Sequence, residues 1–524
     1  MFTALALLLT GCDRGTAPAP HQGSQQAASA PDAGQPFTIL AGSELKDVEP
    51  ALKAAAQTAG VVLQVRYAGT LDIVERVNAG GRFSAILPPN GAYPALALTT
   101  KPVAREKLFY SRVALGVKPG TLQKLGWSVQ APPTWADIAR AAGQGKLRYA
   151  MTNPSSSNTG MSALFAVASA VAGKTEDLDE KEVDAKVLKD FLKGHQLTAG
   201  SSGWLAEAFA KDSSGVDAIV NYEAVILRLN EQLPAAERLA LIYPKDGVIT
   251  ADYPLMLLDG SRRADFDKLV NAIKAAPFQR EPLQKAYLRP SSPDAAPHPA
   301  LPTAAVAELA FPNRLEVIDA VLMSYQSELR RPATSIFVLD TSGSMRGQRL
   351  ADMQHALKIL SGAESGGAAS QRYAAFQSRE RVTLIPFWNA VGQPVHVSFA
   401  PDTLAQNRQQ IAAYAEQLKA EGGTAIYDAL TLATRLARQD MSRDADRFVS
   451  IVLLTDGESN HGRGFAQFAR EQQAEKAMVR VFPIIFGEAA SHEMQQLAEL
   501  TGGRAFDARK TGLAQVFKEI RGYQ

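Results

Sequence analysis

Acidic and hydroxyl side chains recur along the C-terminal third of the chain at spacings that suit a cation. Asp340, Ser342 and Ser344 alternate in the segment DTSGS, and Asp456 lies in the segment TDG. A fifth oxygen is available from Thr424, which follows two glycines. Carboxylate and hydroxyl oxygens, without histidine or cysteine, are the ligands that hard cations such as Mg²⁺ prefer. The sequence therefore predicts a magnesium site at these five residues, with Mn²⁺ or Ca²⁺ as alternative ions.

The segments that carry these residues lie at the ends of predicted elements. DTSGS follows the apolar run SIFVL, TDG overlaps the end of FVSIVLLT, and EGGT precedes a helix. Predicted strands cover 335–339, 382–387, 395–399, 448–455, 479–486 and 504–508, and predicted helices cover 349–362, 403–420, 425–438, 464–477, 492–501 and 513–521. This alternation favours a doubly wound α/β sheet, in which ligands bind beyond the C-terminal ends of the strands. The three loops should therefore meet at one edge.

The order of the three segments resembles the metal ion-dependent adhesion site of von Willebrand factor A domains. The resemblance covers about 335–524, and Asp340, Ser342, Ser344, Thr424 and Asp456 fill all five positions of that motif. It implies a Rossmann-like fold that binds a partner protein, whose Glu or Asp completes the coordination of the metal. It leaves open whether the two aspartates contact the ion directly or through water. A helix cap and a turn would explain DTSGS and TDG one at a time, but not three segments in this order.

A second α/β pattern precedes this region. Predicted strands cover 37–41, 61–67, 83–87, 113–117, 149–152, 218–221 and 239–243, and predicted helices cover 44–59 and 71–79. Strands that alternate with helices indicate a parallel sheet. About 260 residues suit two such lobes.

Several segments of this region resemble bacterial extracellular solute-binding proteins of the two-lobed, hinged type found in molybdate- and sulfate-type binders. They are FTILAGSEL, RYAGTLDIVERV, FSAILPPNGAYPAL and VDAIVNYEAV, and the resemblance covers roughly 37–290. It implies a periplasmic-binding-protein-like domain whose ligand loops carry Ser43, Thr70, Asn90 and Tyr222. Hydroxyls at helix N-termini form a ready anion site, so we expect a small anionic solute. The segment SAIL stands where an Asp often precedes the third loop, which leaves open whether the solute has been exchanged for a protein or peptidoglycan partner.

The single cysteine, Cys12, closes the short apolar segment FTALALLLTGC. This segment is too short to cross a bilayer. Its end, LTGC, resembles the bacterial lipobox, in which the cysteine is acylated. No Lys or Arg precedes the apolar segment, so we expect the natural start upstream of Met1. Asp13 resembles the signal that retains lipoproteins at the inner membrane, which implies a lipid anchor on the periplasmic side of the cell envelope.

Two segments of biased composition divide the chain. Residues 13–36 are rich in Ala, Pro, Gly, Gln and Ser, which predicts a disordered tether, and 289–302 is punctuated by prolines. The predicted organisation is a lipoprotein signal peptide at 1–12, the tether at 13–36, a solute-binding-like domain at 37–290, a linker at 291–312 and a von Willebrand factor A domain at 313–524.

The charge balance of the chain and the motifs that it lacks argue against nucleic-acid binding and against catalysis. Lys+Arg number 55 against 53 for Asp+Glu, and no long basic block is present, so nucleic acid is not an expected partner. The chain has no G-x-S-x-G motif and no histidine pair at metal-ligand spacing, so no catalytic residue is predicted. We therefore expect a lipid-anchored envelope binding protein rather than an enzyme. The alternative is a solute receptor for an ABC-type transport system, docked through its C-terminal domain. A hydrolase is the weakest hypothesis, because the sequence contains no recognisable pair of a nucleophile and a general base.

Overall fold

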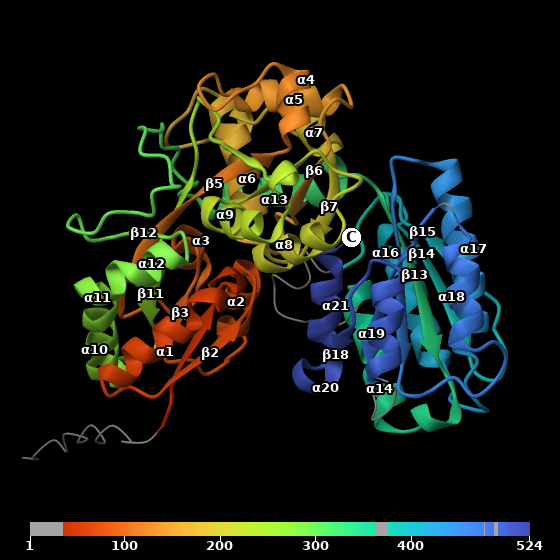
Figure 1. Ribbon diagram of the computed structural model, residues 1–524. Helices are drawn as coiled ribbons and strands as arrows, with labels where there is room; N and C mark the ends of the chain where they lie inside the picture. The colour runs from red at the N-terminus through yellow and green to blue at the C-terminus, as the bar shows by residue number, and fades with distance from the viewer. Residues whose placement is uncertain (1–34, 363–374, 476, 487–490, 524) are drawn as a thin grey trace, which may run out of the picture. The chain divides into compact units, whose positions relative to one another are not determined.

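The computed structural model describes residues 35–362, 375–475, 477–486 and 491–523 (Figure 1). Cys12, Asp13 and the predicted tether up to residue 34 lie outside these ranges. The described strands form three sheets. Two belong to the N-terminal region and one to the C-terminal region, and we call the N-terminal region up to residue 290 the head.

The first sheet of the head has the strand order β2-β1-β3-β11-β4. Its strands are β1 (Phe37–Ala41), β2 (Leu63–Tyr67), β3 (Ala85–Leu87), β4 (Ala104–Lys107) and β11 (Pro254–Leu257). Its helical elements are the short 3-10 turn η1 (Ser43–Val48), α1 (Glu49–Thr58), α2 (Thr70–Asn78), α3 (Ala92–Ala97) and α10 (Arg263–Lys274). The predicted helix over 44–59 is divided after Val48, because Pro50 favours the first turn of a new helix.

The second sheet of the head has the order β10-β5-β8-β6-β7, with β9 and β12 also paired to β5. Its strands are β5 (Phe109–Val117), β6 (Tyr149–Thr152), β7 (His195–Ala199), β8 (Ala218–Tyr222), β9 (Ala240–Ile242), β10 (Thr250–Ala251) and β12 (Arg289–Pro290). Helices of this lobe include α4 (Pro119–Leu125), α5 (Trp135–Gly143), α6 (Asn158–Val171), α7 (Ala185–Lys193), α8 (Ser202–Lys211) and α9 (Glu223–Gln232). Helix α6 is buried on all sides over most of its length, as its apolar composition requires.

Both sheets of the head are mixed, so the expectation of purely parallel sheets is wrong. Strands β1, β2 and β3 run parallel as predicted, but β11 pairs antiparallel with β3 and with β4. The reason is connectivity. The chain passes from the first sheet to the second between β4 and β5 and returns between β10 and β11, so the returning strand enters the first sheet in the opposite direction.

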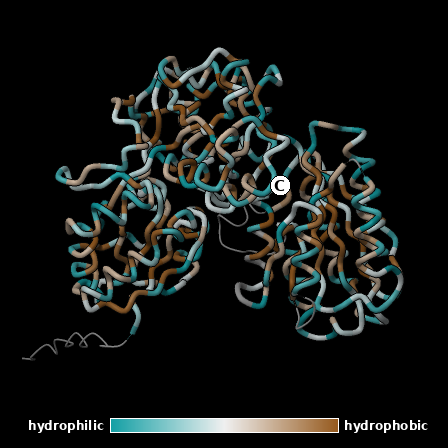
Figure 2. Tube along the Cα trace, in the orientation of Figure 1, coloured by the Kyte–Doolittle hydropathy of each residue, from teal (hydrophilic) through white to brown (hydrophobic). Residues whose placement is uncertain are grey.

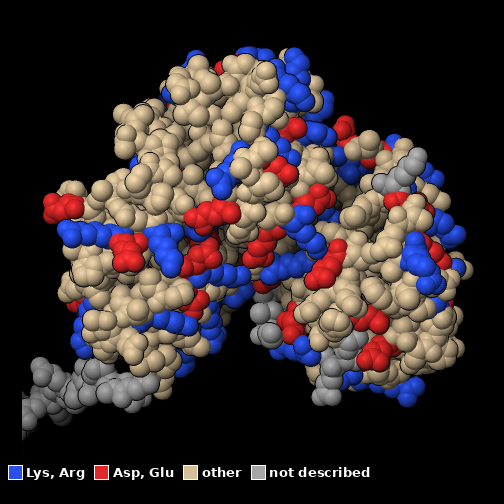
Figure 3. All heavy atoms as spheres, viewed as in Figure 1, with Lys and Arg blue, Asp and Glu red and all other residues tan. Residues whose placement is uncertain are grey.

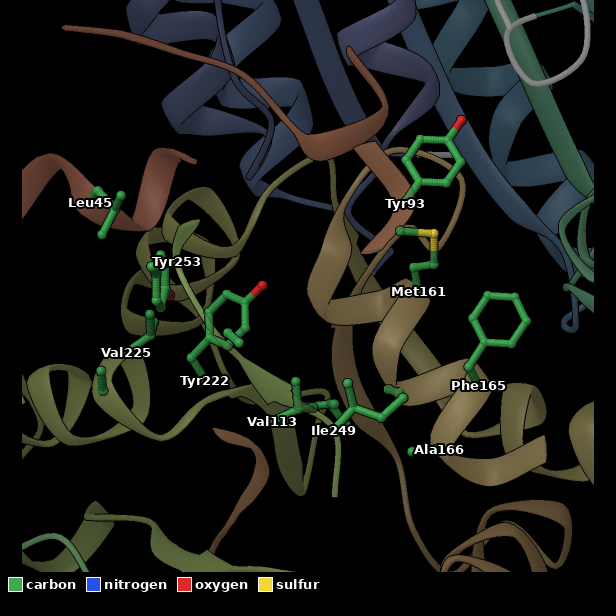
Figure 4. Packing of buried hydrophobic residues seen from close by; sticks show 14 of the residues in the cluster. Leu45, Tyr93, Val113, Met161, Phe165, Ala166, Tyr222, Val225, Ile249 and Tyr253 are labelled. Atoms are coloured by element: carbon green, nitrogen blue, oxygen red, sulfur yellow. The ribbon is translucent and has the colours of Figure 1, made fainter. Parts of the chain in front are cut away.

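Helix α13 (Leu315–Ser324) follows the predicted linker and packs into the core of the head. Its Ile318, Val321 and Leu322 belong to the same cluster of buried apolar residues as Phe165 of α6. Figure 4 shows part of this cluster, including Met161 and Phe165 on one helix.

The C-terminal sheet has the order β15-β14-β13-β16-β17-β18. Its strands are β13 (Ala333–Asp340), β14 (Arg381–Phe387), β15 (Val395–Ser398), β16 (Phe448–Thr455), β17 (Arg480–Ile485) and β18 (Phe506–Asp507). All neighbours are parallel except β14 and β15. This confirms the predicted doubly wound fold class.

Helices cover both faces of this sheet. Phe337 and Leu339 of β13 face one core, and Ile336 and Val338 face the other. Helices α14 (Gln348–Ser361), α16 (Leu404–Gln417) and α21 (Leu513–Arg521) contribute to the first core, and α17 (Ile426–Arg443), α18 (Phe465–Gln473) and α19 (Ser491–Leu500) to the second. The strands are accordingly the most hydrophobic segments of this region (Figure 2). Burial of both faces of β13 and β16 fixes the edge at which their loops emerge.

Two surface properties bear on partners. Within the described ranges, no helix is both long enough and apolar enough to cross a bilayer. On the face drawn in Figure 3, acidic and basic side chains are interspersed, in agreement with a formal net charge of only +2.

Candidate functional site

Three loops meet at the C-terminal edge of the C-terminal sheet. Strands β13 and β16 are parallel neighbours that end at Asp340 and Thr455, so the segments DTSGS and TDG begin side by side. The third loop is tied to the first by its backbone. The Gly343 N–H donates to the Gly422 carbonyl at 3.0 Å, and the Glu421 N–H donates to the Thr341 carbonyl at 2.8 Å. The predicted convergence of the three loops is therefore present in the fold.

Four of the five predicted metal-binding residues form one hydrogen-bonded network. Ser342 Oγ lies 3.0 Å from Ser344 Oγ, and the Ser344 hydroxyl donates to Asp456 Oδ1 at 2.8 Å. Asp340 Oδ1 accepts the backbone N–H of Ser342 at 2.8 Å, and its Oδ2 accepts the Thr455 hydroxyl at 2.7 Å. Asp340, Ser342 and Asp456 are buried. The network thus presents fixed oxygens at the floor of the loops.

Thr424, the fifth residue, is held in place by Asn460. The Thr424 N–H donates to Asn460 Oδ1 at 2.8 Å, and the Thr424 carbonyl accepts the Asn460 N–H at 2.9 Å. Asn460 lies four residues after Asp456, in the loop that follows β16. The sequence analysis did not single out Asn460 or Thr455, although Thr455 is the first residue of the TDG segment.

The two carboxylates of the site, Asp340 and Asp456, have different electrostatic surroundings. Burial raises the pKa of Asp340 above its ordinary value. Asp456 instead has a direct cationic partner, since Arg349 in the first turn of α14 lies 2.5 Å from Asp456 Oδ2. Arg349 was not predicted from the sequence, because an arginine on a polar helix surface is common.

The donor set fits a small divalent cation. Two oxygens that bind Mg²⁺ at about 2.1 Å and at a right angle lie about 3.0 Å apart, which is the separation of the Ser342 and Ser344 hydroxyl oxygens. No group of three or more His, Cys, Asp and Glu suited to a metal occurs within the described ranges. The ligands of a cation at this edge would therefore be two carboxylates and three hydroxyls. They belong to Asp340, Asp456, Ser342, Ser344 and Thr424.

Buried polar atoms without hydrogen-bond partners gather in the head. They are Ser43 Oγ, Glu44 Oε1, Thr70 Oγ1, Asn158 Oδ1, Ser201 Oγ, the Tyr253 hydroxyl, Arg112 Nη1 and Trp204 Nε1. The first three lie at the starts of η1 and α2 on the first lobe, and Asn158 and Ser201 lie at the starts of α6 and α8 on the second. We call Ser43, Glu44, Thr70, Asn158, Ser201 and Tyr253, together with Tyr222, the interlobe cluster. It contains Ser43, Thr70 and Tyr222 of the predicted ligand residues.

The two lobes approach closely around this cluster. A Cβ atom on Gly69 would lie 2.3 Å from the Ser156 carbonyl oxygen, and one on Gly203 would lie 3.3 Å from the Ser43 carbonyl oxygen. Side chains larger than glycine would therefore push the lobes apart at both positions.

Two tyrosines line the cluster. The Tyr222 hydroxyl accepts from Asn158 Nδ2 at 3.0 Å, and the Tyr222 and Tyr253 ring centroids are 6.1 Å apart (Figure 4). Tyr253 has a φ of 32°, a strained value for a non-glycine residue that is typical of binding sites.

Asn90, the fourth predicted ligand residue, has a local role. Its Nδ2 donates to the Thr250 carbonyl at 3.2 Å and its Oδ1 accepts the Ala92 N–H at 2.8 Å. The side chain therefore holds the loop between β3 and α3 against β10. Glu44, which the sequence analysis did not single out, lies in the cluster instead.

Comparison with known families defines the class of each half of the chain. Residues 37–284 match the model of the bacterial extracellular solute-binding protein family, and residues 336–519 match that of the von Willebrand factor type A domain. The chain is thus a two-domain α/β protein with a solute-binding-type domain followed by a von Willebrand factor A domain. Domains of the second type commonly bind a divalent metal ion.

Similarity to individual proteins is partial. Inter-alpha-trypsin inhibitor heavy chain H4 of Sus scrofa is 33% identical over 135 residues, covering 25% of this chain and 13% of the relative. The human protein of the same name is 30% identical over 183 residues, covering 33% of this chain and 18% of the relative. The chain spans less than a fifth of the length of either relative.

Solved structures of periplasmic binding proteins match the head region. The periplasmic binding protein AfuA from Actinobacillus pleuropneumoniae, with fructose-6-phosphate bound, is 15% identical, with 56% of this chain and 98% of that chain covered and a TM-score of 0.43. The ferric binding protein from Campylobacter jejuni is 12% identical, with 54% and 96% covered and a TM-score of 0.41.

Proposed function

We propose that this protein is a lipid-anchored binding protein of the cell envelope that captures a partner protein through a divalent cation. The cation is Mg²⁺, with Mn²⁺ or Ca²⁺ as alternatives, and its ligands are Asp340, Ser342, Ser344, Thr424 and Asp456. The observation that carries the proposal is the Ser342–Ser344–Asp456 network at the edge where β13 and β16 end. Its oxygens are spaced as neighbouring ligands of one ion. No catalytic step is assigned to the protein.

The charge of the site favours an acidic partner. Two carboxylates and three hydroxyls supply at most five of the six oxygens that Mg²⁺ takes. A Glu or Asp side chain from a partner can fill the open position. The site therefore favours a partner protein with an exposed Glu or Asp side chain that can reach the cation.

Affinity capture tests this function. The full chain, used as bait on detergent-solubilised envelopes, should retain the partner with Mg²⁺ and release it with a chelator. Asp340→Ala should abolish capture, whereas Asp402→Ala, which removes an exposed carboxylate outside the site, should not. Capture that is identical with Mg²⁺ and with the chelator would overturn the proposal.

A second function, that of a solute receptor for an ABC-type transport system docked through its C-terminal domain, is favoured by the interlobe cluster. Buried side-chain atoms without hydrogen-bond partners, six of which lie in this cluster, are costly unless a ligand satisfies them. A solute held between the lobes should raise the melting temperature through linkage. Neighbouring genes for a permease and an ATPase would favour this receptor role over partner capture.

Anchoring and location complete the proposal. Acylation of Cys12 would hold the chain at the membrane, because two or three acyl chains anchor far more firmly than one. Asp13 favours the inner membrane, so both domains would face the periplasm beyond a tether at 13–36. With the natural start restored, Cys12→Ser should move the protein to the soluble envelope fraction, and unchanged membrane association would contradict lipidation.

A further inference from the structure

Residues 291–312 lie between the two regions that match known families, 37–284 and 336–519. This segment packs against the head, since Leu301 and Leu309 are buried. Leu309 also belongs to the larger apolar core of the head. We call residues 291–312 the strap.

The strap begins at the first connection between the two lobes. Leu108 is the single residue between β4 of the first lobe and β5 of the second, and its carbonyl accepts the Ser291 hydroxyl at 2.9 Å. The same carbonyl accepts Gln279 Nε2 at 3.0 Å, and Gln279 Oε1 accepts the Ser291 N–H at 2.7 Å. Gln279 is buried at the end of α11 (Ala276–Gln279), which follows α10 of the first lobe. The start of the strap is therefore fixed both to the first connection and to the first lobe.

The end of the strap is fixed to the second connection. The Glu308 carboxylate accepts two hydrogen bonds from Thr250, one from its N–H and one from its hydroxyl, both at 2.8 Å. Thr250 lies in β10, the last strand before the chain returns to the first lobe at β11. The Thr250 carbonyl in turn accepts Asn90 Nδ2 of the first lobe at 3.2 Å. A residue of the strap and a residue of the first lobe thus hold the same residue of this connection.

Backbone pairing reinforces the contact at Glu308. The Val248 N–H donates to the Ala307 carbonyl and the Leu309 N–H donates to the Val248 carbonyl, both at 2.9 Å, so the strap runs parallel to the chain at Val248. Gly247 has a φ of 124°, and a Cβ atom on it would lie 2.8 Å from Leu309 Cγ. The strap can therefore lie this close only because the residue beneath it is glycine.

The lobes of a hinged domain move about the few residues that connect them. Both connections are bonded to the strap, one at Leu108 and the other at Thr250. We propose that the strap restrains the opening and closing of the two lobes, and that the contact between Glu308 and Thr250 must break before the lobes move freely. The inference rests on the receptor function proposed for the head, because such a restraint regulates the access of a solute.

Distance measurements between the lobes test this restraint. Spin labels at Gln57→Cys in the first lobe and Lys189→Cys in the second, both exposed positions, report the interlobe distance by double electron–electron resonance. The protein is the full chain with Cys12→Ser, so that only the two labels are attached. We expect one distance population while Glu308 is intact. Glu308→Ala should add a second population, and amide exchange of residues 248–254 should become roughly tenfold faster.

Asn313→Ala is the matched control, because Asn313 follows the strap and donates to Asp177 of the second lobe at 2.5 Å, away from both connections in the sequence. This variant should keep the single population. Thr250→Val removes the hydroxyl but keeps the N–H, so it should shift the distances in the same direction as Glu308→Ala but less.

Three results would overturn the restraint. They are a second population already present in the wild type, the same single population in Glu308→Ala as in the wild type, and a second population in Asn313→Ala as large as that in Glu308→Ala. The receptor function is tested separately by the effect of solutes on the melting temperature, so none of these results decides it.

Discussion

Arg349 and Ser344 bind opposite oxygens of the same carboxylate, that of Asp456. Arg349 lies 2.5 Å from Oδ2, and the Ser344 hydroxyl donates to Oδ1 at 2.8 Å. With Arg349 included, the site carries two negative charges and one positive charge, so a divalent ion would leave it with an excess of one positive charge. A carboxylate from a partner would remove that excess. We therefore expect Arg349 to couple retention of the ion to binding of an acidic partner.

The first prediction follows from this coupling. Arg349→Gln should bind Mn²⁺ roughly tenfold more tightly than the wild type in the absence of a partner, because a like charge next to the ion is removed. Titration calorimetry with Mn²⁺ measures the affinity. Arg346→Gln is the control, since Arg346 lies on the same loop but donates to the Ala420 carbonyl rather than to Asp456. Weaker Mn²⁺ binding by Arg349→Gln would show that Arg349 positions Asp456 instead.

The second prediction separates charge from coordination. Asp340→Ala should abolish binding of Mg²⁺ and Mn²⁺, because it removes one of two carboxylates, whereas Ser342→Ala should weaken binding less. Loss of the Asp340 carboxylate removes the acceptor that lies 2.7 Å from the Thr455 hydroxyl and leaves this hydroxyl the Gly457 carbonyl at 3.4 Å, at a cost of about 1 kcal/mol. Both variants should still unfold cooperatively, since β13 is buried by its own apolar side chains. Divalent-ion binding by Asp340→Ala equal to that of the wild type would contradict the role of this residue.

The C-terminal strands were predictable because burial on both faces selects continuous apolar runs. The predicted strand over 448–455 coincides with β16, and the motif residues follow directly from the strand ends. Arg349 and Asn460 were not predictable, because their roles depend on contacts with residues more than thirty positions away in the chain.

The head was less predictable for a related reason. Strands β4, β7 and β11 were missed because they are short or carry polar residues, and β11 joins its sheet only through a return crossing. Glu44 could not be distinguished from a residue on an exposed helix face, since its burial depends on the approach of α8 and Tyr253. Ser43, Thr70 and Tyr222, which the resemblance to solute-binding proteins suggested as ligand residues, lie in the interlobe cluster, and their role as ligands stays a prediction.

The third prediction concerns the pH dependence of stability. Burial raises the pKa of Glu44 from 4.5 to about 7, so the folded state holds this proton more firmly than the unfolded state. Stability from this group is present below pH 4.5 and is lost as the pH rises to about 7, a change on the order of 3 kcal/mol. Glu44→Gln should therefore be more stable than the wild type at pH 8 but not at pH 4.5, as measured by urea unfolding. Equal differences at both pH values would mean that the Glu44 carboxyl does not titrate in this range.

The last prediction concerns His195, whose effect on the pH dependence of stability is opposite in sign to that of Glu44. His195 is buried, its ring stacks on Tyr149, and its Nε2 lies 2.8 Å from the Met151 carbonyl. Burial lowers the pKa of His195 from 6.5 to about 4. The unfolded chain takes up this proton first, so stability falls as the pH drops from 6.5 to about 4, again by on the order of 3 kcal/mol.

The contributions of Glu44 and His195 should nearly cancel in the wild type between pH 4.5 and 6.5. Urea unfolding across this window should give a rising stability with pH for Glu44→Gln, where only His195 acts, and a falling stability for His195→Gln, where only Glu44 acts. His492→Gln, which changes an exposed histidine, should match the wild type. The double variant Glu44→Gln, His195→Gln should again be nearly flat, and a double variant that keeps either slope would show that another buried group dominates the titration.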